Sequence, residues 1–328
     1  MERAWSDNAH NRVRGPARVL IWAVAGVLLL GAAYYVYVGS KAFRRELADF
    51  APTPDDSAPL RQRNAEAMLE IAEPVYWTLS DGSRQRAFYR PSRNGALIVY
   101  AHGAPGAGAG FHPYVRELAA RGYGALALDL PGYGASEGAR AWDDRFAESL
   151  RKAVDFAVAE GVEPGRIGGF GYSMGVYSIA RAAAEDSRIG ALTLQAGFTN
   201  MHDQLLRQFR WRVPGVGYFA VAAAYLKGVD VLEKDTEAAL ARVGDRPVMV
   251  INGTEDYAIP LSMGEALVDV AANGRLWIIE GAGHGDFADA FGSGFYQELD
   301  GFWRANLLAA MPAAAGVGHV STIEGRSN

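Results

Sequence analysis

The stretch of sequence that decides the fold is Gly171-Tyr172-Ser173-Met174-Gly175. It follows a strand-like run at 166–170 and opens a helix-like run at 176–184. A G-x-S-x-G sequence between a strand and a helix is typical of a sharp turn that exposes the serine hydroxyl, and the glycines leave room where the backbone is crowded. A chance match in a glycine-rich chain is the alternative. The flanking segments favour the turn, so Ser173 is the candidate nucleophile.

Asp256 and His284 follow the serine in the order acid, then base, that such a site requires. Asp256 ends the turn after a β-branched run at 248–251, and an acid at the end of a buried strand reaches the crevice above a parallel sheet. Glu255 beside it is interpreted as a solvated turn residue. His284 lies in a glycine-flanked loop after a strand-like run at 276–279. This placement makes it the candidate general base rather than an ordinary surface histidine.

The segment His102-Gly103-Ala104-Pro105 follows an apolar run at 96–101. In a site of this kind, one oxyanion-binding N–H comes from the residue after the nucleophile and another from the loop after the third strand. Met174 supplies the first. Pro105 has no N–H, so Ala104 is the candidate for the second. His102 is interpreted as a loop-shaping residue that hydrogen-bonds to the backbone, not as a catalytic base.

These motifs resemble the α/β-hydrolase superfamily and, within it, the membrane-tethered serine hydrolases of the ABHD/Bem46 type. The matching segments span about residues 75–308; they are His102-Gly103, the loop 129–138, the elbow 171–175, 253–256 and 281–284. The resemblance implies a Ser-His-Asp hydrolase of esters, thioesters or amides. It also implies an α/β fold with a mostly parallel central sheet, helices on both faces and a helical cap insertion. Val176 departs from the pattern, since many relatives have a further glycine there, and crowding at the start of the elbow helix is expected.

Two other features of the sequence narrow the function. The loop 129–138 lacks the Lys-Ser/Thr of a phosphate-binding P-loop and the spacing of a dinucleotide fingerprint, so it is interpreted as a turn bordering the site. The 328 residues carry a formal net charge of -5 and no cysteine. This composition argues against nucleic acid as a partner and excludes disulfides and a thiol nucleophile. We expect no metal and no cofactor, because no cluster has metal-ligand spacing.

The amino terminus contains about twenty uncharged residues at 19–38, VLIWAVAGVLLLGAAYYVYV. A helix of that length, at about 1.5 Å per residue, spans about 30 Å, the hydrocarbon thickness of a bilayer. A single-pass anchor is favoured over a signal peptide cleaved near Gly31-Ala32-Ala33, because the apolar run continues past that site. Arg3, Arg12, Arg14 and Arg18 precede the segment, and Lys41, Arg44 and Arg45 follow it. This small excess favours a catalytic domain outside the cytoplasm.

The rest of the chain divides around these segments. Residues 1–18 form a basic segment, 39–73 a juxtamembrane tether with a short amphipathic helix at 61–71, 74–310 the hydrolase domain, and 311–328 a tail with an Ile-Glu-Gly-Arg sequence typical of a protease linker. The domain is expected to start with a hairpin at 75–79 and 84–89. Further strands are expected near 96–101, 125–130, 166–170, 191–194, 248–251 and 276–279. Helices are expected near 112–121, 144–160, 174–185, 262–272 and 294–309.

Between about 199 and 245 the alternation of strands and helices breaks, and this segment is interpreted as the cap. It is rich in large apolar residues, namely Leu205, Leu206, Phe209, Trp211, Val213, Tyr218, Phe219, Val221, Tyr225 and Leu226. Together they predict an apolar acyl site under the cap, with a cap face that rests on the bilayer as the alternative. Arg207, Arg210 and Arg212 are interpreted as solvated charges, with binding of an anionic headgroup as the alternative.

The sequence therefore predicts a membrane-anchored enzyme that cleaves a carboxylic ester through an acyl-enzyme, with a small-molecule or lipid-like substrate. Three other functions use the same fold: a serine peptidase or amidase, a cofactor-free haloperoxidase, and a non-catalytic membrane-tethered ligand-binding protein. The intact serine, acid and histidine argue against the last of these. Fold alone does not choose among them.

Overall fold

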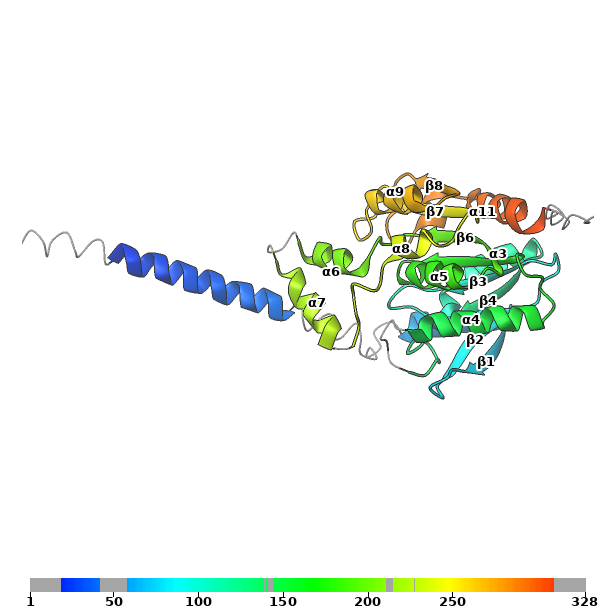
Figure 1. The fold of residues 1–328 in the computed structure, drawn as a ribbon, viewed down its shortest axis with the longest axis horizontal. Helices are drawn as coiled ribbons and strands as arrows, with labels where there is room; N and C mark the ends of the chain where they lie inside the picture. The colour runs from blue at the N-terminus through cyan, green and yellow to red at the C-terminus, as the bar shows by residue number, and fades with distance from the viewer. Residues whose placement is uncertain are drawn as a thin grey trace, which may run out of the picture.

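The computed structural model describes residues 19–41, 58–138, 140, 144–210, 215–226 and 228–309. Within these residues, eight strands form one sheet in the order β1-β2-β4-β3-β5-β6-β7-β8 (Figure 1). The strands are β1 Glu73–Thr78, β2 Arg84–Arg90, β3 Leu97–Ala101, β4 Gly124–Leu128, β5 Ile167–Tyr172, β6 Ile189–Gln195, β7 Val248–Gly253 and β8 Gly274–Ile279. β2 pairs antiparallel with β1 and β4, and all neighbours from β4 to β8 are parallel. The expected mostly parallel α/β sheet is confirmed.

Helices cover both faces of this sheet (Figure 1). They are α2 Ala58–Leu69, α3 His112–Ala120, α4 Asp144–Ala159, α5 Met174–Glu185, α6 Met201–Arg210, α7 Gly217–Leu226, α8 Thr236–Leu240, α9 Leu261–Val270, α10 Phe287–Phe291 and α11 Phe295–Trp303. A short 3-10 turn, η1 Gly108–Phe111, precedes α3, and a π-helical turn, η2 Arg304–Leu308, follows α11.

The central strands are apolar along their whole length because both of their faces are buried. In β3, Leu97 and Val99 belong to the core beneath α4, α5, α8 and α9, whereas Ile98 and Tyr100 belong to the core beneath α2, α3, α10 and α11. All five residues of β3 are buried. A strand buried on both faces has no polar alternation, and this explains why the sequence shows β3 as a continuous apolar run.

The sheet topology places the candidate site at the carboxyl ends of the central strands β3 and β5. From β3 the chain moves outward to β4 on one side, while β5 pairs with β3 on the other side and starts the run to β8. The carboxyl ends of β3 and β5 are therefore neighbours at the position where the strand order reverses. Ligands of open α/β sheets bind in the crevice outside such a switch point.

Most of the expected strands and helices are present within a few residues of their predicted bounds, but four segments differ. The helix expected at 294–309 is divided into α11 and η2, and the short α8 and α10 are additional. The helix α2 is not part of a loose tether, since Met68 is fully buried and the Arg90 guanidinium donates to the carbonyl of Ile71. The folded unit therefore begins before residue 74.

The most apolar 18-residue window of the N-terminal helix Val19–Lys41 has a mean hydropathy of 2.2, and none of that window is buried. By length and composition it can cross a membrane. Figure 1 shows that it leads to the cap helices α6 and α7, which lie between it and the sheet. Its last turns contact α7, where the rings of Tyr35 and Phe219 lie 5.7 Å apart. Residues 1–18, 211–214 and 310–328, with their expected roles, lie outside the described residues.

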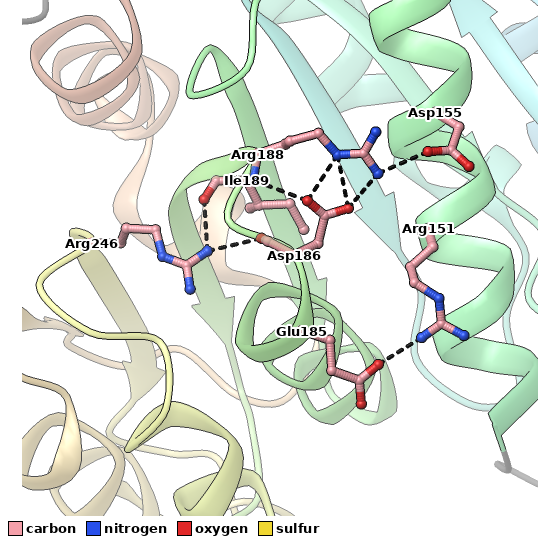
Figure 2. Close-up of polar contacts among 7 residues, drawn as sticks. All are labelled: Arg151, Asp155, Glu185, Asp186, Arg188, Ile189 and Arg246. Atoms are coloured by element: carbon pink, nitrogen blue, oxygen red, sulfur yellow. Dashed lines mark hydrogen bonds and ion pairs between the residues drawn. The ribbon is translucent and has the colours of Figure 1, made fainter. Parts of the chain in front are cut away.

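A polar network joins α4, the end of α5 and the start of β6 (Figure 2). Arg188 bonds to Asp186 at the end of α5 and to Asp155 of α4, and Arg151 of α4 pairs with Glu185 of α5. The guanidinium of Arg246 donates to the backbone carbonyls of Ala183, Asp186 and Ile189. Burial by itself would raise the pKa of Asp186, but the hydrogen bonds from Arg188 hold it below its ordinary value.

Candidate active site

Ser173 lies in the turn between β5 and α5, with backbone angles of φ 51° and ψ -115°. A serine rarely adopts this conformation, and such strain persists only where the surroundings enforce it. The two glycines of the pentapeptide make the turn possible. A Cβ on Gly175 would lie 1.9 Å from the carbonyl oxygen of Ala101, and one on Gly171 would lie 2.6 Å from Val176 Cα. The expected strand–turn–helix around the serine is confirmed.

The three candidate catalytic side chains lie together although they are far apart in the sequence. Nε2 of His284 is 3.1 Å from Oγ of Ser173, and Nδ1 of His284 is 2.8 Å from Oδ2 of Asp256. Asp256 follows β7, and His284 lies in the loop after β8. The histidine can thus accept a proton from the serine while the carboxylate fixes its tautomer.

Asp256 is nearly fully buried and is held by its own turn. Its Oδ1 accepts the backbone N–H groups of Ala258 and Ile259, at 3.0 and 2.8 Å. This leaves Oδ2 to the imidazole of His284. Glu255 is exposed, as expected for a solvated turn residue.

Tyr172 supports the histidine, a contact that sequence reasoning did not foresee. Its hydroxyl donates to the carbonyl of His284 at 2.5 Å, and the two rings lie 5.4 Å apart. Burial, with smaller contributions from Asp256 and Asp286, raises the pKa of Tyr172 to about 12, so the hydroxyl remains a donor at neutral pH. The one sequence signal for this role was its position directly before the serine.

The loop after β3 passes beside the serine. A Cβ on Gly103 would lie 3.0 Å from Cβ of Ser173, a tight contact, so a glycine suits this close approach. Ala104 follows in the same loop, and Met174 begins α5. Among the described residues, neither of these two N–H groups has a backbone or side-chain acceptor. Ala104 and Met174 thus remain the candidate oxyanion donors.

His102 shapes this loop, as the sequence predicted. Its Nδ1 bonds to the carbonyl of Gly103 at 2.7 Å, and its Nε2 accepts the N–H of Leu130 at 3.1 Å. These two bonds require a neutral ring that donates from Nδ1. Burial lowers the pKa of His102, which agrees with that state.

The loop 129–138 hydrogen-bonds to the loop after β3. Asp129 is fully buried, and its carboxylate accepts the N–H of Gly108, the N–H of Ala135 and the guanidinium of Arg86. Sequence reasoning placed this loop at the mouth of the site and missed the carboxylate. An aspartate directly after a buried strand was the available signal.

A cavity of about 430 Å³ lies beside the serine turn. Its described lining comes from α2, the loop after β3, η1 and α3, together with Tyr172, Gln195 and Gly285. Among the described residues, none of its lining comes from the 199–245 insertion. One wall of this cavity is α2, with Leu60, Arg61 and Asn64, and the acyl site expected under the cap stays a prediction. The cap helices pack instead on Tyr177, Phe198 and Ile259.

Comparisons with known proteins agree with this geometry. A family model described as "alpha/beta hydrolase fold" matches residues 96–228. The uncharacterized protein YfhR of Escherichia coli O157:H7 is 27% identical over 241 residues, which cover 70% of this chain and 80% of YfhR. A 2-hydroxy-6-oxononadienedioate/2-hydroxy-6-oxononatrienedioate hydrolase of Cupriavidus pinatubonensis is 27% identical over 271 residues, covering 68% of this chain and 93% of that enzyme. Human ABHD12B is 25% identical over 54% of this chain and 50% of its own length.

Among solved structures, an esterase of Pyrococcus furiosus, Pf2001, matches with a TM-score of 0.61 and 18% identity, covering 74% of this chain and 94% of the esterase. The sheet order, the serine turn after β5 and these matches define one class of protein. The chain has the α/β-hydrolase fold, and the matches support its membership of the α/β-hydrolase superfamily.

Proposed function

We propose that this protein is a membrane-anchored serine hydrolase that cleaves carboxylic esters with an apolar acyl group. The observation that carries the proposal is the chain of contacts from Ser173 through His284 to Asp256, at 3.1 and 2.8 Å. The similarity to the Cupriavidus hydrolase and to the Pyrococcus esterase supports hydrolysis as the reaction class. The cavity beside the serine, lined by Leu60, Ala109 and Phe111, supports an apolar group on the substrate.

The proposed reaction has two steps. His284 takes the proton of Ser173 as the serine oxygen attacks the ester carbonyl, and the same histidine then gives this proton to the departing alcohol. The N–H groups of Ala104 and Met174 stabilise the oxyanion; each such donor contributes about 3 kcal/mol to lowering the barrier in comparable sites. Asp256 stabilises the imidazolium. Water, activated by His284, then releases the carboxylic acid and restores the serine.

The first test is Ser173→Ala against wild type on a panel of p-nitrophenyl esters from acetyl to palmitoyl. We expect kcat to fall by about 10³-fold or more without loss of thermal stability, because the nucleophile is removed and little packing changes. Ser178→Ala is the matched control, since Ser178 lies in α5 and its buried hydroxyl has no hydrogen-bond partner among the described residues. A fluorophosphonate probe should add its mass to wild type and to Ser178→Ala, and not to Ser173→Ala.

Each result of this panel has a defined meaning. Full turnover in pure Ser173→Ala would refute the serine mechanism. Faster cleavage of matched amides than of esters would assign the protein as an amidase or peptidase. A wild-type protein that neither reacts with the probe nor hydrolyses any ester would favour the non-catalytic ligand-binding function.

We also propose that the helix Val19–Lys41 is an uncleaved single-pass anchor with the catalytic domain on the extracytoplasmic side. The mean hydropathy of 2.2 in its most apolar window and its exposed apolar surface support a membrane span. The excess of arginine before the span supports the orientation.

A further inference from the structure

A second cavity, of about 350 Å³, lies in the cap, apart from the serine site. It is lined by Asp203, Leu206 and Arg207 of α6, by Gly215, Gly217 and Tyr218 at the start of α7, and by Met263 of α9. None of these residues lines the cavity beside Ser173.

Arg207 is the unusual residue in this cavity. It was expected to be a solvated charge, but it is half-buried, and its Nε is out of contact with solvent and has no hydrogen-bond partner among the described residues. A buried donor without a partner is costly, and more so on a charged group, so the site favours a ligand that supplies an anionic oxygen. Of the two other arginines expected to resemble it, Arg212 lies outside the described residues, as does the side chain of Arg210.

Asp203 adds a negative charge to the same cavity. It stands four residues before Arg207 on α6, so the two side chains share one face of the helix, with Cβ atoms about 5–6 Å apart. Hydrogen bonds with Asn200 and His202 lower the pKa of Asp203, which keeps its carboxylate ionised at neutral pH. In the described part of the chain the carboxylate of Asp203 contacts Asn200 and His202, and no ion pair joins it to Arg207. The cavity therefore offers separate positive and negative groups.

The position of the cavity indicates where its ligand comes from. A Cβ on Gly39 would lie 2.5 Å from the ring of Phe219 in α7, and one on Gly215 would lie 2.9 Å from the hydroxyl of Tyr35, so the N-terminal helix rests against α7 and the cavity rim. Tyr35 is six residues from the end of this helix at Lys41, about 9 Å at about 1.5 Å per residue. The polar headgroup layer of a bilayer is about 5–8 Å deep on each side. If the helix spans the membrane, the cavity lies level with the headgroups.

The surface next to the cavity is apolar and exposed. Tyr218, Tyr225 and Leu226 of α7 are 60%, 44% and 73% exposed, respectively. Large apolar side chains that are exposed beside a membrane-spanning helix are suited to the acyl boundary of a bilayer, with the tyrosines at headgroup level.

We propose that the cavity between α6 and α7 binds the zwitterionic headgroup of a membrane phospholipid, phosphoethanolamine, with the phosphate on Arg207 and the ammonium on Asp203. This site is separate from the hydrolytic one; the proposal rests on the proposed membrane anchor and not on the proposed reaction. The bound lipid would fix the cap at the bilayer surface.

Native mass spectrometry of the full-length protein in detergent micelles tests the site with three probes: phosphatidylethanolamine, phosphatidylglycerol of the same acyl chains, and inorganic phosphate. We expect one phosphatidylethanolamine to bind at least tenfold more tightly than phosphatidylglycerol. Arg207→Gln should weaken this binding at least tenfold, and Asp203→Asn should abolish the preference between the two lipids. The control Arg242→Gln, at an exposed arginine near the end of α8, should change neither value.

The outcomes separate the possible failures. Unchanged lipid binding by Arg207→Gln, at an unchanged melting temperature, would overturn the site. Displacement of the lipid by millimolar inorganic phosphate would show a free-phosphate site and would overturn the lipid source. Ser173→Ala should bind the lipid like wild type, and Arg207→Gln in detergent should hydrolyse soluble esters like wild type, so loss of one function is distinguishable from loss of the other.

A second measurement does not depend on the Arg207 variant. Because the chain has no cysteine, Tyr218→Cys can carry a single environment-sensitive fluorophore in nanodiscs. Quenching by lipids that are spin-labelled near the headgroup is expected at position 218 and not at Lys152→Cys on α4. Equal quenching at the two positions, or none at 218, would overturn the placement of the cavity at the bilayer surface.

Discussion

At the scale of single residues, the serine turn depends on how its neighbours fill space. The departure from the family pattern at Val176 is accommodated by another residue, Gly197, just after β6. A Cβ on Gly197 would lie 2.4 Å from Cγ1 of Val176, so a glycine at 197 provides the space that the valine takes. Val176 is fully buried in the core beneath α5.

This pairing predicts a coupled effect of two substitutions. Gly197→Ala should destabilise the protein by about 1–3 kcal/mol, because the added methyl overpacks a closed core. The same change made in Val176→Ala should cost much less, giving a coupling energy of about 1–2 kcal/mol in a double-mutant cycle of urea unfolding. Additive effects of the two changes would show that Val176 and Gly197 do not compete for this space.

His102 predicts a pH dependence of stability. Burial lowers its pKa in the folded protein below the unfolded value of about 6.5, so the unfolded state binds more protons at mildly acidic pH. The stability that neutral His102 provides is thus present above about pH 6.5 and is lost as the pH falls through the folded pKa. His102→Gln should reduce the loss of unfolding free energy between pH 7.5 and pH 5.5. His112, whose pKa burial also lowers, is kept in both proteins, so an identical loss in both would exclude His102 as the source.

At the scale of secondary-structure elements, side chains from neighbouring segments hydrogen-bond to the elements that carry the candidate site residues. Arg246 is the clearest case, because it joins the segment before β7 to the end of α5 and the start of β6 (Figure 2). Asp256 follows β7, and Ser173 directly precedes α5. The helix α2 acts on the other side by closing one wall of the cavity.

We expect Arg246→Ala to lower the free energy of unfolding by about 2–3 kcal/mol, since four carbonyls, those of Ala183, Asp186, Ile189 and Val243, lose a charged donor in a partly buried setting. Arg242→Ala is the matched control: its guanidinium bonds to one exposed carbonyl, and its loss should cost under about 0.5 kcal/mol. Urea unfolding of the three proteins measures both values. Equal stabilities of the two variants would show that the network in Figure 2 does not hold these elements.

At the scale of the whole molecule, a continuous series of contacts runs from the N-terminal helix through the cap to the sheet domain. The helix meets α7, α7 packs with Val216, Phe198 and Tyr177, and Tyr177 belongs to α5 directly behind the serine. The cap thus joins the N-terminal helix to the elbow helix, while the cavity beside the serine lies elsewhere on the domain.

The orientation of this assembly can be measured with single cysteines in the cysteine-free chain. Lys152→Cys, exposed on α4, should react with a membrane-impermeant maleimide in intact spheroplasts of the expression host, because the proposed topology, favoured by the arginine excess, puts the domain outside the cytoplasm. Ser6→Cys should react only after lysis, in a protein of undiminished mass. Labelling of Ser6→Cys alone would invert the topology, and a mature protein lacking residue 6 would establish a cleaved signal peptide.

Sequence reasoning succeeded where a short segment carries its own physical signal. Buried parallel strands appear as apolar runs, the serine turn requires glycines at fixed positions, and the span of 19–38 has the length and composition of a membrane helix. The order of serine, acid and histidine could also be seen in the sequence. From these the α/β fold and the candidate residues Ser173, Asp256 and His284 could be predicted.

Only the tertiary structure decided which surfaces meet. Residues distant in the chain meet in the cavity wall formed by α2, in the hydrogen bond from Tyr172 to His284 and in the hydrogen bonds to Asp129. The burial of Arg207 Nε without a partner likewise depends on packing. A sequence pattern records the period and chemistry of one element, but burial of a polar group depends on what another element places against it. The sequence by itself therefore determined the elements and the order of the reactive groups, and packing determined the shape of the cavity and the use of the cap.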